Sequence, residues 1–309
     1  MNALESYTDL NQAVEQAKPQ ATVIATPSNL HVKHAKAMLG FGIHVMVEKP
    51  LSNSLSGVYK LQEIVYKSDS VFMMAHTYRF REEWQRIKSL LDSAPVGKVY
   101  TAEFSGGLYL PDWHYQEDYR KEYAANKKQG GGVLLTSLSH FFDLVDWYFG
   151  KIINVAGVKS KQSDLDLDVE DVVTCTVKTD SGILVTFYED FLSRSPRRTF
   201  RVNGEFGYIE IDFNRKTLCI WDSRKNRFLP SATLENDIEL FRILEDGIGY
   251  KMEPELQQLG YSGNDAYLAE LKHFLNLVDK GESDSKLNID AGMKVLEVIN
   301  HARLQNWMT

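Results

Sequence analysis

The sequence predicts an α/β domain with a parallel sheet covered by helices, followed by an α+β domain with a large, mostly antiparallel open sheet. Over about the first 95 residues, short apolar runs alternate with segments of helical spacing, which is typical of a parallel sheet with helices on both faces. Beyond them, apolar runs follow one another at hairpin-like spacing, which indicates antiparallel strands. We therefore expect one domain over residues 1–95 and a second over residues 96–309.

The expected strands of the first domain are short and almost continuously apolar, as in sheets that are buried on both faces. They are "ATVIAT", which stops at Pro27, then "HVMVEK", which ends in two charged residues, and "SVFMMAHT". The helices expected around them cover residues 8–17, 29–42 and 54–68.

The second domain is expected to begin with a strand over residues 97–110 and a polar, aromatic loop over residues 111–132. A helix over residues 133–150 follows and ends at Gly150. Further strands are expected over residues 153–160, 171–179, 182–190, 199–204, 207–213 and 217–222. Two long helices, near residues 264–280 and 288–306, finish the chain and are candidates for packing back on the first domain.

The composition of the 309 residues, 43% hydrophobic and 25% charged, is that of a globular protein. A net charge of −7 argues against a general nucleic-acid grip. No apolar run approaches the ~18 residues that span a bilayer, so we expect no membrane association. The two cysteines offer no disulfide framework and no Cys/His metal spacing, so we expect no metal and a reducing, cytoplasmic location.

The stretch "HVMVEKPLS" ends a buried strand in Glu48, Lys49 and Pro50. In open parallel sheets, ligands bind at the carboxyl ends of the strands, where these residues fall. A residue before proline is held out of the helical region, so Lys49 stays extended at the rim. There its amine can reach a cleft between the domains and donate hydrogen bonds to a substrate oxygen. The alternative is a surface ion pair beside a turn proline.

Two motifs in "VIATPSNLHVKHAKAMLGFGIHVMVEKPLS" resemble the glucose–fructose oxidoreductase and inositol dehydrogenase family, Gfo/Idh/MocA. That family shows a Thr-Pro-x-x-x-His segment and then Glu-Lys-Pro at this spacing. "LPDWHYQEDYRKEYAA", "GGGVLL" and "VEDVVTCTVKTDSGILVTF" match as well, so the likeness covers nearly the whole chain.

The resemblance implies hydride transfer between NAD or NADP and a hydroxyl or keto carbon of a sugar, cyclitol or nucleotide sugar. It also implies that Lys49 binds the reacting oxygen, and that the chain forms a homodimer or homotetramer through the second sheet. The residues that would line the dinucleotide are Thr26, Pro27, His31, Glu48, Lys49 and His76.

The chain departs from the family pattern at the phosphate-binding turn. The family opens with a strand, a Gly-rich turn and a helix, whose amide groups hold the pyrophosphate. The Gly-x-Gly-x-x-Gly pattern occurs nowhere in the 309 residues, since residues 130–132 follow a loop and residues 247–249 lack the third glycine. We therefore expect a truncated Rossmann-like sheet with an exposed edge that a partner subunit or rearranged local structure would cover.

A second departure concerns Thr136 and His140, where the family typically has Asp-x-x-x-His. Four residues apart on a helix, the two side chains share one face. The resemblance makes His140 the general base or acid, with a pKa suited to neutral pH. Thr136 offers a hydroxyl but no charge, and Asp143 could partly substitute for the missing carboxylate. The alternative is a His140 that packs in the domain seam, with activity lost.

The remaining candidates are substrate ligands. By resemblance, Trp113, His114 and Tyr119 border the substrate cleft, although the same loop could simply be pinned to its own domain. Arg79 follows the third strand and could bind a carboxylate or phosphate, or serve structure alone. The five acids within residues 163–171 are expected to be a solvated approach to a strand.

A rival interpretation assigns the chain to another class. It would be a non-catalytic remnant of the family that binds a sugar or a protein partner. The missing Gly-rich turn and Thr136 both favour it.

Overall fold

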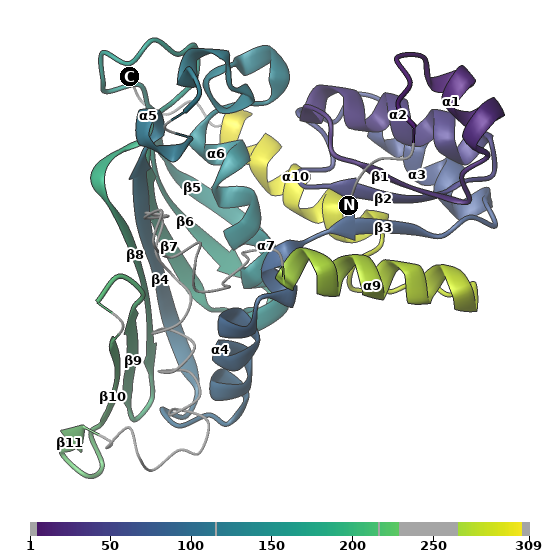
Figure 1. Cartoon of the computed structure of the whole chain (residues 1–309). Coiled ribbons are helices and arrows are strands. Elements are labelled where there is room, and N and C mark those ends of the chain that lie inside the picture. Colours follow the sequence, from purple (N-terminus) through teal and green to yellow (C-terminus); the bar gives the residue numbers. More distant parts are fainter. Residues whose placement is uncertain (1–4, 115, 216, 229–264, 305–309) are drawn as a thin grey trace, which may run out of the picture.

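The computed structural model describes residues 5–114, 116–215, 217–228 and 265–304. Residues 247–249 and the ends of the predicted last helices at 264 and 305–306 lie outside this range. Figure 1 shows two sheets with helix α10 between them. One sheet has the order β1-β2-β3, and the other has the order β11-β10-β9-β8-β4-β7-β6-β5. This confirms the predicted fold class, a short parallel sheet followed by a larger and mostly antiparallel one.

The small sheet is parallel throughout. Its strands are β1 (Ala21–Ile24), β2 (His44–Glu48) and β3 (Phe72–Ala75), and its helices are α1 (Leu10–Ala17), α2 (Ser28–Gly40) and α3 (Val58–Lys67). Alternate residues of the strands face opposite sides of the sheet. Val45 and Met74 therefore join the main core, whereas Met46 and Met73 join a second cluster.

Two helices from the end of the chain complete this half of the molecule. Helix α9 (Asp265–Lys280) places Phe274 and Leu277 against the second cluster, so it covers the face of the small sheet opposite α2 and α3. Helix α10 (Ile289–Leu304) contributes Leu296 and Ile299 to the main core. The outer edge of β3 is partly covered, because the Met74 amide donates to the Leu287 carbonyl at 2.7 Å.

The large sheet carries its helices on one face. Its strands are β4 (Val99–Tyr109), β5 (Ile152–Ser160), β6 (Val172–Thr179), β7 (Leu184–Asp190), β8 (Leu192–Gly204), β9 (Gly207–Asp212), β10 (Thr217–Asp222) and β11 (Arg227–Phe228). All neighbouring pairs are antiparallel except β4 with β7. In Figure 1, helices α4 (Glu82–Asp92), α6 (Val133–Thr136) and α7 (Leu138–Phe149) lie on one side of this sheet. Within the described ranges, no helix covers the other side.

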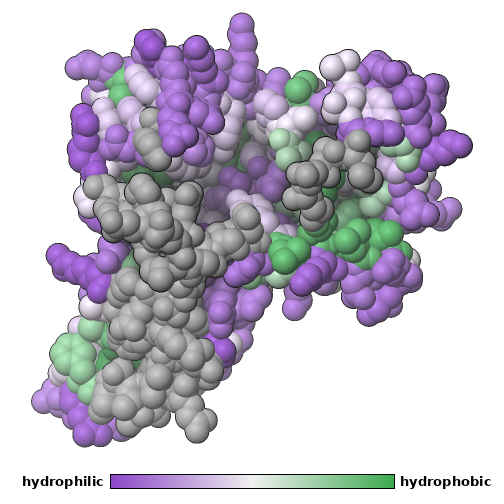
Figure 2. Space-filling model, viewed as in Figure 1, coloured by the Kyte–Doolittle hydropathy of each residue, from purple (hydrophilic) through white to green (hydrophobic). Residues whose placement is uncertain are grey.

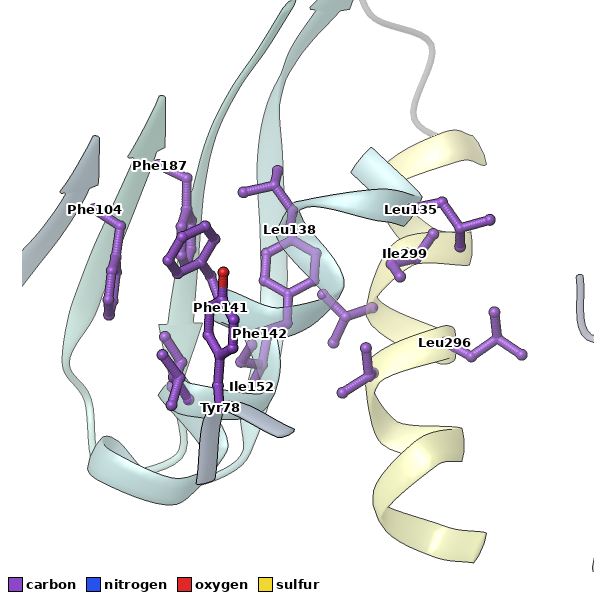
Figure 3. Close-up of a cluster of buried hydrophobic side chains, with 14 of the residues drawn as sticks. Tyr78, Phe104, Leu135, Leu138, Phe141, Phe142, Ile152, Phe187, Leu296 and Ile299 are labelled. Carbon is purple, nitrogen blue, oxygen red and sulfur yellow. The ribbon is translucent and has the colours of Figure 1, made fainter. Parts of the chain in front are cut away.

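Aromatic rings fill the space between the large sheet and α7. Phe104 lies 4.4 Å from Phe200 and 5.5 Å from Phe187 between ring centroids, and Phe142 meets Phe187 edge-on at 5.2 Å. Figure 3 shows this cluster continuing to Leu296 and Ile299 on α10. One continuous core therefore links the helix between the sheets to the large sheet.

Three local predictions differ from the structure. The sequence did not predict α4 or the 3₁₀ turn η1 (Thr77–Phe80). The expected loop over residues 111–132 holds α5 (Leu110–Trp113) and the 3₁₀ turns η2 (Tyr119–Lys121), η3 (Tyr123–Ala125) and η4 (Lys127–Gln129). The helix predicted over residues 133–150 is interrupted at Ser137. In the part of the chain that the structure describes, no helix is long and apolar enough to cross a membrane.

Replacing Phe104 by Ala should lower the free energy of unfolding by about 3–5 kcal/mol, because it empties the centre of the aromatic cluster. Tyr100→Ala is the matched control, since Tyr100 lies on the same strand with half of its surface exposed. Urea unfolding monitored by circular dichroism measures both. Equal losses for the two variants would show that the core is not organised around Phe104.

Candidate active site

Lys49 lies at the carboxyl end of β2 and reaches across to the second half of the molecule. Its Nζ donates a hydrogen bond to the carbonyl of Thr136 at 2.9 Å. The peptide bond between Lys49 and Pro50 is cis. The lysine is half-buried, so its amine sits in the seam between the two sheets rather than in a surface ion pair.

A break in the helix makes the Thr136 carbonyl available. The amide of His140 donates to the carbonyl of Ser137 at 3.2 Å, one residue short of the usual helical partner. The carbonyl of Thr136 therefore accepts from Lys49 instead. The hydroxyl of Thr136 is already used, because it donates to the Gly132 carbonyl at 2.7 Å.

Glu170, from the acidic run, lies against the last glycine of the glycine run. Its Oε1 accepts from the Leu134 amide at 3.0 Å and so caps the first turn of α6. Gly132 has φ of 97°, and a Cβ there would lie 2.4 Å from the same oxygen. The neighbouring Asp171 is buried and accepts from the amides of Gln162 and Ser163. The prediction of a solvated acidic run is therefore wrong for Glu170 and Asp171.

His140 lies near Lys49 and is held by ring stacking. Its imidazole lies 4.0 Å from the Tyr78 ring at an interplanar angle of 10°. Its Nδ1 is buried and has no hydrogen-bond partner among the described residues, although part of the side chain is exposed. Burial holds the pKa of His140 well below 6.5, and the positive charge of Lys49 lowers it further. The imidazole is therefore neutral at pH 7 and can accept a proton.

His31 ties together the ends of β1 and β2. Its Nε2 lies 2.7 Å from the Thr26 carbonyl, and its Nδ1 lies 2.9 Å from the Pro50 carbonyl. The side chain is 1% exposed. His31 therefore joins the backbone just after Lys49 to the backbone at Thr26 from within the protein. Thr26 Oγ1 lies 3.3 Å from His34 Nδ1.

Arg79 and Asp143 form a buried two-point ion pair across the seam. The guanidinium donates to both carboxylate oxygens at 2.8 Å. Burial opposes the charge of Arg79, but Asp143 raises the pKa of the guanidinium in spite of it. Both oxygens of Asp143 are engaged in this way, and Asp143 Oδ1 also lies 3.5 Å from His76 Nδ1. Asp143 is therefore the structural partner of Arg79. It does not substitute for the carboxylate that the family pattern places next to His140.

His76 lies beside this pair after the end of β3, and Glu48 ends the neighbouring strand β2. His76 is 2% exposed and neither ring nitrogen makes a hydrogen bond within the described chain, so burial lowers its pKa. Burial likewise raises the pKa of Glu48. The ends of β2 and β3 thus bring ionisable groups together in a poorly hydrated place.

Sequence reasoning missed Tyr78 and Glu270. Glu270 belongs to α9 and is fully buried, and its Oε2 accepts from Thr77 Oγ1 at 2.9 Å. Thr77 opens the turn η1, which carries Tyr78 against His140 and Arg79 against Asp143. Burial raises the pKa of Glu270 to about 8. No signal in the sequence links residue 270 to a turn almost two hundred residues earlier.

The aromatic loop makes contacts of its own. Trp113 stacks on His114 at 4.6 Å, and the Tyr119 hydroxyl accepts from the Asp166 amide at 3.0 Å. Tyr123 stands between this loop and the strand ends, and burial together with the charge of Glu48 raises its pKa to about 12. A substrate role for Trp113, His114 and Tyr119 stays a prediction.

The structure thus brings Lys49, His140, His76 and Arg79 to one seam, with His31, Thr26 and Pro27 behind it. Figure 2 shows the surface hollowed between the two lobes, with hydrophilic residues in the hollow. A lysine amine and a neutral imidazole in such a recess can bind and deprotonate an alcohol.

Replacing Asp143 by Ala should lower the free energy of unfolding by about 3–5 kcal/mol, because Arg79 would remain buried without its counter-charge. Asp146→Ala is the matched control on the same helix. Asp146 pairs with the half-exposed Lys294 at 3.3 Å and should cost under about 1 kcal/mol. Chemical unfolding of both variants measures the difference, and a small loss for Asp143→Ala would contradict the structural role of this pair.

Glu270 should make stability fall as the pH rises. Its pKa moves from 4.5 to about 8 on folding, so the folded state retains a proton that the unfolded state loses. The stability that this retained proton provides is fully present below pH 4.5 and is lost as the pH rises through 8. The variant Glu270→Gln should therefore match the wild type near pH 4.5 and exceed its stability near pH 8.

Thermal unfolding over this pH range measures the effect, with Glu282→Gln as an exposed control. Parallel curves for Glu270→Gln and the wild type would contradict a proton held on Glu270.

Comparison with known proteins identifies two matching family models. A Gfo/Idh/MocA C-terminal domain model matches residues 84–210, and a model described as an oxidoreductase family with an NAD-binding Rossmann fold matches residues 2–76. Among solved structures, levoglucosan dehydrogenase in complex with NADH superposes with a TM-score of 0.74 at 18% identity. The match covers 96% of this chain and 80% of that one, and it supports the fold.

Curated relatives are distant in sequence. Myo-inositol 2-dehydrogenase of Thermotoga maritima is 22% identical over 94% of this chain and 79% of its own length. A 1-carboxy-3-chloro-3,4-dihydroxycyclohexa-1,5-diene dehydrogenase of Comamonas testosteroni is 25% identical over 57% of this chain. The match spans only 43% of that relative. The two family models together match residues 2–76 and 84–210, more than half of the chain, and the chain belongs to the Gfo/Idh/MocA oxidoreductase family.

Proposed function

We propose that the chain is an NAD-dependent oxidoreductase that transfers a hydride to or from a hydroxyl or keto carbon of a sugar, cyclitol or nucleotide sugar. The observation that supports this most is the convergence of Lys49 and His140 on one seam at the carboxyl ends of the parallel strands. NADP is an alternative cofactor that the described residues do not distinguish. A cytoplasmic location stays a prediction.

The names of the relatives support the substrate class. The Thermotoga relative is named for myo-inositol, and other similar proteins are named 1,5-anhydro-D-fructose reductase and levoglucosan dehydrogenase. All three names denote oxidation or reduction of a polyhydroxylated ring compound. A cleft with a lysine, neutral histidines and aromatic rings suits such a ring.

The strand ends fit the nicotinamide end of the cofactor. Pro27, Glu48 and His76 would line the ring, and the buried unpartnered nitrogens of His76 and His140 leave polar capacity for a ligand there. NAD, when bound, supplies a two-electron acceptor for the hydride. The described chain offers no Gly-rich turn for the pyrophosphate, so the phosphate contacts are left unassigned.

The residues of this chain would divide the work as follows. Lys49 donates hydrogen bonds to the substrate oxygen and stabilises the negative charge that develops on it. His140, neutral because its pKa is low, takes the proton of that hydroxyl as the hydride leaves the same carbon. In the reverse direction, the imidazolium returns the proton to the carbonyl oxygen.

The lack of a free carboxylate next to His140 in the described part of the chain favours the rival interpretation, a non-catalytic protein that binds a sugar or a partner. Thr136 uses its hydroxyl within the helix, and Asp143 is engaged by Arg79. Lys49, Arg198 and Arg81 carry the positive charges that act on His140, and each of them lowers its pKa. A protonated His140 would therefore have weak support, which would slow proton transfer.

We also propose that two or four copies associate through the large sheet. The side chains of β6 and β7 alternate, with Val173, Cys175 and Val185 buried toward the helices. The opposite face bears Leu184, which is 45% exposed, and further along the same strand Tyr188. A sheet face without helices commonly meets a second sheet. Light scattering of the purified chain tests this, and a monomer would oppose it.

Replacing Lys49 by Ala, or His140 by Gln, should lower kcat/KM by about 10²–10⁴-fold, because each removes a group that acts on the reacting oxygen. Lys67→Ala, which changes an exposed lysine of α3, should retain activity. NADH formation with a panel of cyclitols, sugars and nucleotide sugars measures this. Because the pKa of His140 is lowered, wild-type activity should persist to well below pH 6.5 before protonation removes the base.

NADH fluorescence titration separates the two classes of function. Saturable binding with turnover on any member of the panel supports the enzyme. Binding of a sugar by a folded chain without NADH binding supports the non-catalytic alternative, and unchanged turnover in Lys49→Ala would end the catalytic assignment.

A further inference from the structure

We propose that His114, Glu117 and Glu122 form a site for one divalent transition-metal ion at the turn after α5. One ligand atom from each side chain lies within 4.8 Å of the others. His114 Nδ1 lies 2.9 Å from Glu122 Oε2. Two donor atoms ~2.1 Å from a common ion are about 3 Å apart in an octahedral site and about 3.4 Å apart in a tetrahedral one. The present spacing of this pair therefore already suits shared coordination.

Glu122 provides an independent reason to expect a ligand. Its side chain is 6% exposed, and both carboxylate oxygens are buried without a hydrogen-bond partner among the described residues. The approach of His114 does not meet hydrogen-bond geometry in spite of its length. A buried carboxylate that accepts no hydrogen bonds is unfavourable, and a cation between it and the imidazole would satisfy it.

The three side chains are already positioned by the turn. The Glu117 amide donates to the His114 carbonyl at 2.7 Å, and the Glu122 amide donates to the Tyr119 carbonyl at 3.1 Å. The His114 ring is stacked on Trp113, which packs against the main core. Little conformational freedom would therefore be lost from His114 and Glu122, and Glu117, which is exposed, can close on the ion by rotation.

The donor set indicates the class of ion. One imidazole nitrogen and two carboxylates suit Zn²⁺, Co²⁺ or Mn²⁺ better than Ca²⁺ or Mg²⁺, which prefer oxygen ligands alone. Three protein ligands leave at least one position open, and the exposure of His114 and Glu117 directs it to solvent. The spacing of the two cysteines predicts no metal site. The three ligands proposed here include no cysteine, so that spacing gives no signal for them.

An ion at this place would hold the loop of residues 114–122 in position near the end of β2. Trp113 lies 6.4 Å from Tyr123 between ring centroids, and Tyr123 is close enough to Glu48 to feel its charge. The metal site does not depend on the proposed oxidoreductase activity. Among the described residues, no hydrogen bond or ion pair joins its three ligands to Lys49 or His140.

Titration of the metal-stripped full chain with CoCl₂ tests the proposal. We expect one Co²⁺ per chain, a visible d–d absorption band, and a rise in thermal stability with Co²⁺ or ZnCl₂. His114→Gln and Glu122→Gln should weaken Co²⁺ binding at least ~10-fold. Asp118→Asn is the matched control, because this carboxylate of the same loop pairs with Arg120 at 2.7 Å and should leave binding unchanged.

Circular dichroism establishes that each variant folds, and His114→Gln, which alters an exposed side chain, keeps the test valid if Glu122→Gln does not. Equal Co²⁺ affinity in the wild type and His114→Gln would overturn the proposal, as would uptake that does not saturate.

Discussion

The hydrogen bond from Lys49 to the Thr136 carbonyl is the constraint on which the seam depends. It requires an extended lysine at the end of a parallel strand and a carbonyl that a regular helix would have used. The sequence supplies the first through Pro50 and the second through the interruption at Ser137. A strand of one half and a helix break of the other thus meet at a single amine, which a substrate oxygen could share.

Buried polar contacts keep the two halves in this arrangement. The Arg79–Asp143 pair and the Glu270–Thr77 hydrogen bond both anchor the turn η1, one from α7 and the other from α9. That turn holds Tyr78 against His140, so the imidazole is oriented by packing instead of by a carboxylate. Ion pairs of this kind add little net stability, but the loss of one partner is costly, which fixes the arrangement.

The sequence predicted the order and type of the sheets because alternation, apolar runs and glycine or proline boundaries are local signals. It also singled out Lys49 and His140 by their motifs, and the structure brings the two residues to one seam, while their catalytic roles stay a prediction. It did not predict the break at Ser137, nor that Glu170, from a distant strand approach, caps the first turn of α6. Nor did it predict Glu270, whose partner Thr77 is 193 residues away. Tertiary contacts of this length leave no periodic trace.

The electrostatic surroundings of His140 set the chemistry that the seam can support. Burial and neighbouring cations both favour the neutral imidazole, so the ring is unprotonated at neutral pH and can take up a proton, but it is a weak base. A carboxylate at residue 136 would shift that balance toward the imidazolium, and Thr136 leaves it where burial puts it. Proton transfer from an alcohol to this histidine then requires that the negative charge forming on oxygen be held by Lys49. Because residue 136 provides no carboxylate to stabilise the imidazolium, the amine of Lys49 has to stabilise the oxygen while the imidazole of His140 takes the proton.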